Sequence, residues 1–84
     1  MMDAPTRWMV RSNEMSQKEQ ETLILLTQGL TPGEIADLLQ VTPNYIYALI
    51  RLLKARFNAR TAAGVVACAL REGILEAVDS AWEE

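Results

Sequence analysis

The chain has 84 residues, of which 50% are hydrophobic and 23% charged, the composition of one small globular domain with a single core. It contains no histidine and a single cysteine, Cys68, which excludes an internal disulfide and removes the commonest general base and metal ligand. We therefore expect no enzymatic activity, no metal site and no cofactor, and the formal net charge of −3 argues against nucleic-acid binding by the chain as a whole.

The first fourteen residues show no sustained periodicity, so residues 1–14 are expected to form an N-terminal tail. Ser16 stands three residues before Glu19, which is the spacing of a capping box. Apolar residues then recur at helical spacing until Gly29, a residue that commonly ends helices. This pattern predicts a helix over residues 17–29.

Three more helices are predicted from their start signals. Thr31-Pro32 with Glu34 begins a helix over residues 32–39, and Thr42-Pro43 begins another over residues 43–57. Thr61 begins the last one, over residues 62–72. The short connection at residues 40–42 is typical of a helix-turn-helix. No segment alternates with a period of two, so the predicted fold is all-α with no sheet.

The C-terminal segment places Ile74, Val78 and Trp82 at helical spacing. It is expected to be ordered through residue 82, either as a helical extension of the preceding helix or as a fifth helix. Residues 76–84 are also acidic, and we treat them as an acidic C-terminal extension.

The charges of the chain are segregated. The segment from Leu38 to Leu70 contains no acid and four basic residues, and the segment from Glu72 to the end contains five acids and no base. The four basic residues are Arg51, Lys54, Arg56 and Arg60. The longest fully apolar stretch has six residues, far fewer than the ~20 of a membrane span. With no secretory signal visible, we expect a cytoplasmic protein without a membrane partner.

A set of residues keeps the spacing of a known family, without gaps, over residues 15–75. They are Met15-Ser16, Lys18-Glu19, Leu23, Leu26, Gln28-Gly29-Leu30, Glu34-Ile35-Ala36, Leu39, Val41-Thr42, Ile46, Phe57, Thr61 and Ala63. This pattern resembles the DNA-binding domain of LuxR-type regulators, which includes the stand-alone GerE-like proteins.

The resemblance implies a four-helix helix-turn-helix domain over residues 15–75, with the helix over residues 43–57 in the major groove of DNA. It implies a stand-alone transcriptional regulator, because 84 residues leave no room for a receiver or ligand-binding domain. By resemblance, the DNA-binding residues are Lys18, Asn44, Tyr45, Tyr47, Ala48, Arg51, Lys54 and Arg56. Lys54 and Arg56 are assigned to phosphate contacts among these.

A homodimer is predicted through the helix over residues 62–72. From Ala62 to Leu70 this helix has no polar side chain, and a helix that is apolar all round needs cover on every side. The family often dimerises through this helix as well. The predicted interface residues are Val65, Val66, Ala69 and Leu70.

The sequence also departs from the family pattern. The family commonly has lysine where this chain has Tyr47, and polar or charged residues where it has Leu49, Leu52, Gly33 and Gly64. Gln40 replaces a glycine of the turn and would be strained at positive φ. The acidic net charge together with Gly33, Tyr47 and Leu52 favours an alternative function, a protein-interaction module that acts as an antiactivator or sequesters a related regulator. The sequence leaves the choice between a DNA and a protein partner open.

Overall fold

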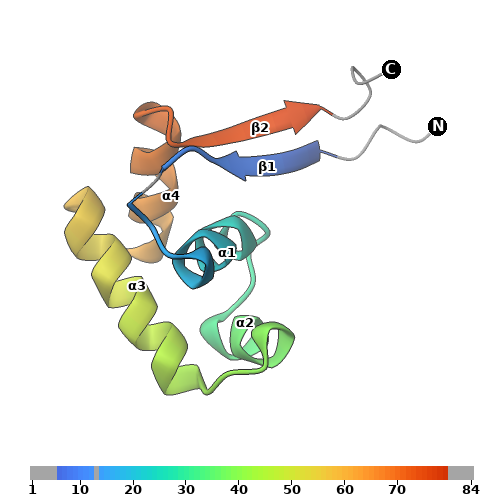
Figure 1. Ribbon diagram of the computed structural model, residues 1–84. Coiled ribbons are helices and arrows are strands. Elements are labelled where there is room, and N and C mark those ends of the chain that lie inside the picture. Colours follow the sequence, from blue (N-terminus) through green and yellow to red (C-terminus); the bar gives the residue numbers. More distant parts are fainter. Residues whose placement is uncertain (1–5, 13, 80–84) are drawn as a thin grey trace.

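A computed structural model describes residues 6–12 and 14–79 of the chain, and the side chains of residues 8–12 and 14–77. The element order is β1 (Thr6–Val10), α1 (Gln17–Leu26), α2 (Pro32–Leu39), α3 (Pro43–Phe57), α4 (Ala62–Arg71) and β2 (Leu75–Asp79), as Figure 1 shows. The protein is thus mostly helical, and the four predicted helices are confirmed. Helices α2 and α3 match the predicted ranges, whereas α1 ends three residues early, in a turn that includes Gly29.

The capping residues predicted from the sequence are present at the starts of α1 and α2. The Ser16 hydroxyl accepts a hydrogen bond from the Glu19 backbone N–H at 3.1 Å, and the Glu19 carboxylate accepts one from the Ser16 N–H at 2.8 Å. Thr31 and Glu34 form the same reciprocal pair at the start of α2. These bonds satisfy backbone donors that have no partner inside the helix, so the helix starts are fixed by local sequence.

The absence of a sheet was wrongly predicted. Strands β1 and β2 pair in antiparallel fashion, with Trp8 opposite Ala77 and Val10 opposite Leu75. Strand β1 lies in the segment expected to be a tail, and β2 lies in the segment expected to be helical. Trp82 and residues 80–84 of the acidic extension lie outside the described residues, so the expected order of residue 82 is not addressed.

Two local features explain why β2 is a strand. Gly73 has a φ of +75°, a conformation that ends α4 and that side chains rarely adopt. After this turn the chain runs extended from Leu75 to Asp79, with Leu75 buried and Glu76 exposed. The helical spacing of Ile74 and Val78 is therefore coincidental, because pairing with the distant β1 decides the conformation.

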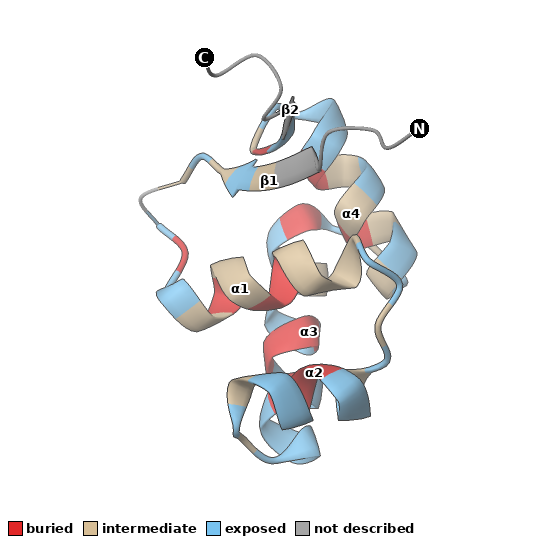
Figure 2. Cartoon of the chain, turned by 90° about the vertical axis from the view of Figure 1, so that its right-hand side faces the viewer, coloured by how far each residue is buried: buried red, intermediate tan, exposed pale blue. Residues whose placement is uncertain are grey.

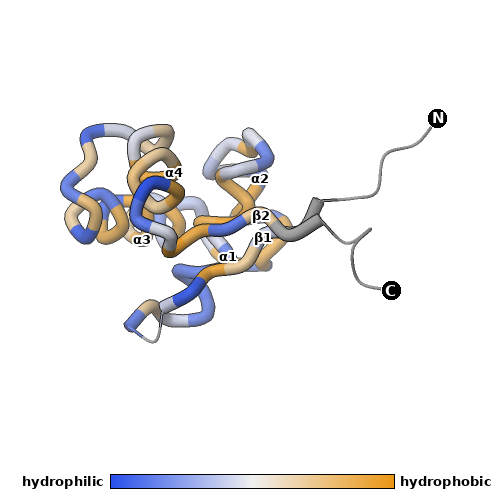
Figure 3. The backbone as a smooth tube through the Cα atoms, turned by 90° about the horizontal axis from the view of Figure 1, so that it is seen from above, coloured by the Kyte–Doolittle hydropathy of each residue, from blue (hydrophilic) through white to orange (hydrophobic). Residues whose placement is uncertain are grey.

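The core consists of two hydrophobic clusters. The first contains Met15, Leu23, Leu53, Phe57, Val65, Ala69 and Leu75, with Trp8 and Val10 of β1 packed against it. The second contains Ile35, Ala36, Ile46, Leu49 and Ile50. Figure 2 shows these buried residues on the inner sides of the helices, and Figure 3 shows the hydrophobic stretches along them from above. No helix of the described residues is long and apolar enough to cross a membrane.

One buried side chain of α1 offers a test of this core. Thr22 is fully buried, and its hydroxyl has no hydrogen-bond partner within the described residues. Thr22→Val keeps the shape and removes the unsatisfied group, so we expect the free energy of unfolding to rise by about 1 kcal/mol. Denaturant titration measures the change.

Thr27→Val is the matched control, because the Thr27 hydroxyl donates a hydrogen bond to the Ile24 carbonyl oxygen. This variant is not expected to gain stability. An equal gain in both variants would contradict the explanation from the Thr22 hydroxyl.

Candidate nucleic-acid interface

Helix α3 has one buried and one exposed side. Its buried side chains are Ile46, Leu49, Ile50, Leu53 and Phe57. With 3.6 residues per turn, the middle of the opposite side is a line formed by Asn44, Ala48, Arg51 and Ala55, all of which are exposed. The side chains of the two alanines are small, so the backbone of the helix is most accessible along this line.

Larger side chains flank this line. Tyr47 and Lys54 lie on one side of it, and Tyr45, Leu52 and Arg56 lie on the other. Tyr45, Tyr47 and Leu52 keep 41%, 52% and 56% of their surface exposed. The residues that the family resemblance assigns to base contacts therefore all lie on the exposed side of α3; they are Asn44, Tyr45, Tyr47, Ala48 and Arg51. Leu38 of α2 adds a further exposed apolar side chain, at 62%.

The basic residues of this surface differ in whether they form ion pairs with acidic residues. Within the described residues, no ion pair joins Arg51, Lys54 or Arg60 to an acid, and Arg51 and Arg60 are exposed. Lys18, on the first turn of α1, pairs with Glu21 of the same helix at 3.5 Å. The positive charge available on α3 thus comes from Arg51 and Lys54.

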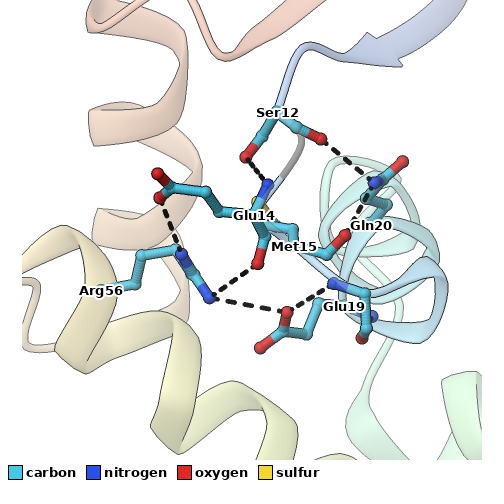
Figure 4. Close-up of polar contacts among 7 residues, drawn as sticks. Ser12, Glu14, Met15, Glu19, Gln20 and Arg56 are labelled. Carbon is cyan, nitrogen blue, oxygen red and sulfur yellow. Dashed lines mark hydrogen bonds and ion pairs between the residues drawn. The ribbon is translucent and has the colours of Figure 1, made fainter.

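Arg56 has a role that the sequence did not indicate. Its guanidinium lies 3.8 Å from the Glu14 carboxylate and 3.7 Å from the Glu19 carboxylate, and it donates a hydrogen bond to the Glu14 carbonyl oxygen. Figure 4 shows these contacts of the last turn of α3 with Glu14, which precedes α1, and with Glu19 in the first turn of α1. The phosphate contact expected of Arg56 competes with these bonds, because both use the N–H groups of the same guanidinium.

The predicted dimer residues of α4 need a correction. Val65 and Ala69 are fully buried in the first hydrophobic cluster, so the prediction is wrong for these two. Val66 is half-buried against the same cluster, and Leu70 is 43% exposed. The domain itself covers one side of α4, which leaves Ala63, Ala67 and Leu70 as its exposed apolar residues.

The turn between α2 and α3 is tightly defined. The Val41 N–H donates to the Ala36 carbonyl oxygen at 3.0 Å, and the Thr42 hydroxyl caps the Tyr45 N–H at 3.2 Å. Gln40 adopts a φ of 60° and a ψ of 45°, which is the left-handed conformation. Gln40 therefore has the positive φ that its place in the turn suggested, although the family pattern has glycine at this position.

The site is a surface, and no pocket is formed by residues 6–12 and 14–79. The same residues hold no group of three metal-ligating side chains. A scan against protein-family models found no match, and a search of curated proteins found none either. The functional argument consequently rests on the geometry and chemistry of α3.

The contacts of Arg56 can be tested through stability. Arg56→Gln removes charge-assisted bonds to Glu14 and Glu19, so we expect the free energy of unfolding to fall by about 1 kcal/mol, a modest value because the side chain is one-third exposed. Lys54→Gln, two residues away and without such a pair among the described residues, serves as the control and should leave stability unchanged. Equal losses in a denaturant titration would contradict the assigned role.

Proposed function

We propose that this protein is a DNA-binding transcriptional regulator of the LuxR type, similar to the stand-alone GerE-like proteins, in which α2 and α3 form a helix-turn-helix. One observation carries the proposal: α3 exposes a line of small and polar residues that includes Arg51, which pairs with no acid among the described residues, while the other side of the helix is anchored in the core. A major groove about 12 Å wide admits such a helix.

The chemistry of the central line suits base recognition. The Arg51 guanidinium can donate two parallel hydrogen bonds to O6 and N7 of guanine, and the Asn44 carboxamide can pair with adenine. Arg51 lies seven positions after Asn44, a rise of about 10 Å along the helix. Ala48 lies between the two, where its methyl group suits a thymine methyl.

The phosphate contacts of this proposal are few. Lys54 lies beside the central line, where an ammonium group reaches the DNA backbone instead of a base edge. Since Lys18 pairs with Glu21 and Arg56 with two acids, few cations remain to release counterions from DNA. We therefore propose weak non-specific binding by one copy, with useful affinity reached when two copies bind neighbouring half-sites.

A protein-interaction module is the second candidate function. Four large apolar side chains, Leu38, Tyr45, Tyr47 and Leu52, remain exposed on α2 and α3. Tyrosines with a nearby arginine are typical anchors of protein interfaces. Under this alternative the same surface binds a related regulator and prevents that regulator from acting.

Variants of α3 separate the two candidates. In a fluorescence anisotropy titration at two salt concentrations, Arg51→Ala should relax sequence preference by about 1–3 kcal/mol at one base pair. Lys54→Ala should weaken binding to all duplexes alike and reduce the salt slope by about one. Tyr47→Lys should raise general affinity, because it adds a positive charge beside the groove.

The protein-partner alternative predicts the opposite pattern. Tyr47→Ala and Leu52→Ala would then abolish a complex with a partner regulator, and no variant would affect DNA. Failure of both the wild type and Tyr47→Lys to bind any duplex at ~50 mM salt would refute the DNA proposal, because low salt maximises the electrostatic attraction.

Dimerisation through α4 is the remaining part of the proposal. The exposed Ala63, Ala67 and Leu70 allow two copies of α4 to approach closely across a two-fold axis. Leu70→Glu should convert a dimer to a monomer in sedimentation velocity at tens of micromolar, whereas Arg71→Glu on the same helix should have less effect. A wild-type protein that sediments as a monomer would contradict this arrangement.

A further inference from the structure

The register of the two-stranded sheet shows which backbone groups of β2 point away from β1. The Arg11 N–H donates to the Ile74 carbonyl oxygen at one end of the ladder. Along an antiparallel ladder, hydrogen-bonded pairs alternate with pairs that exchange no hydrogen bond. Counted from Arg11 and Ile74, the pair formed by Trp8 and Ala77 exchanges none. The N–H and C=O groups of Ala77 therefore point out of the sheet, along the outer edge of β2.

This outer edge of β2 is open. Among the described residues, no backbone group outside the pairing with β1 bonds to Leu75 or Ala77. Ala77 is exposed, although Leu75 on the same face of the strand is buried. The helices thus cover the sheet near Leu75 only, and Figure 1 shows both strands extending past α1. An edge of this kind can accept a further strand.

The middle residues of the two strands differ in size and burial. Trp8, in the middle of β1, is half-buried and packs against the first hydrophobic cluster. Ala77, in the middle of β2, is small and exposed. A second strand can therefore approach β2 closely over its whole length, so β2 offers the better edge.

The edge of β2 is complementary to itself. In an antiparallel two-fold pairing centred on Ala77, this residue lies opposite its own copy, and Leu75 lies opposite Asp79 of the second copy. Glu76 then lies opposite Val78 of the second copy. Each acid of the strand thus faces an apolar residue, whereas like charges directly opposite each other would be destabilising. The backbone groups that point outward in one copy meet those of the other.

We propose that the outer edge of β2 is a self-association surface, at which a second copy of this chain pairs its own β2 in antiparallel fashion. The two sheets of two strands become one sheet of four, in the order β1-β2-β2-β1. A two-stranded sheet is marginally stable, and added strands stabilise it. Because β1 and the core already hold β2 extended, pairing requires little ordering of the strand.

This contact is separate from the proposed α4 contact and does not depend on DNA binding. It comprises about six backbone hydrogen bonds, two for each bonded pair, which makes it small beside the interfaces of stable dimers. We expect it to form at roughly hundreds of micromolar, above the range proposed for α4. Together the two contacts would join dimers into tetramers at high concentration, since closed two-fold contacts combine in this way.

Proline at position 77 tests the edge directly. The Ala77 N–H points away from β1, so Ala77→Pro keeps the β1–β2 hydrogen bonds and removes a donor of the outer edge. In the Leu70→Glu background, which isolates this contact from α4, sedimentation equilibrium at ~500 µM should show dimers that Ala77→Pro converts to monomers. The unfolding midpoint should stay unchanged. Glu76→Pro should instead lower the midpoint, because it removes a bond between the strands.

Thr6→Pro is the matched control, because it changes the outer edge of β1 and should leave the dimer of the Leu70→Glu variant intact. Monomeric Leu70→Glu protein at ~500 µM would overturn the proposal, and so would dimers that survive Ala77→Pro. If wild type is already monomeric at tens of micromolar, the α4 contact fails, and the same measurements still decide the β2 contact.

A disulfide gives an independent measurement of the register. In the proposed pairing the Cα atoms of the two copies of residue 77 lie about 5.5 Å apart, within the range that a disulfide spans. In a Cys68→Ser background, Ala77→Cys should therefore form covalent dimers under oxidising conditions. Glu76→Cys should not, because its two copies are offset diagonally. Equal cross-linking of both variants, or none of Ala77→Cys, would overturn the pairing.

Discussion

The rest of the structure depends on the burial of one side of α3. Ile46, Leu49 and Ile50 belong to the cluster shared with α2, and Leu53 and Phe57 belong to the cluster shared with α1, α4 and β2. One helix thus joins two cores that are each small. Because both ends of its buried side are anchored, α3 cannot rotate without opening a cluster, and the direction of its exposed side is fixed.

The β1–β2 pair completes this anchoring from outside the helical part. Trp8, Val10 and Leu75 belong to the same cluster as Phe57 or pack against it. Arg56 connects the last turn of α3 to the segment between β1 and α1 and to the first turn of α1. An isolated two-stranded sheet is marginally stable in water, so packing against the helices stabilises the strands. The strands in turn cover the hydrophobic cluster of the helices. Figure 1 shows the two strands beside α1 and α4, at the end of the domain away from α2.

Local sequence signals predicted the four helices. The features that were not predicted depend on contacts between residues far apart in the sequence. Thr31-Pro32 and Thr42-Pro43 act within four residues, so their helix starts could be read directly. The pairing of Met9 with Glu76 joins residues far apart in sequence, and no periodicity reveals it. The burial of Val65 and the ion pairs of Arg56 likewise depend on packing. The exposed residues of α3 were predictable because helical spacing alone separates its two sides.

Net charge is a poor guide to the partner of this surface. The domain extends 39 Å along its longest axis, whereas the screening length at physiological salt is about 8 Å. Acids distant from α3 are therefore screened from a ligand on it, and Glu76 is further offset by its pair with Arg11. Glu19 and Glu34 are bound in helix caps. What a partner meets is Arg51 and Lys54 among exposed tyrosines and Leu52, so the balance between these cations and the apolar surface decides which class of partner binds.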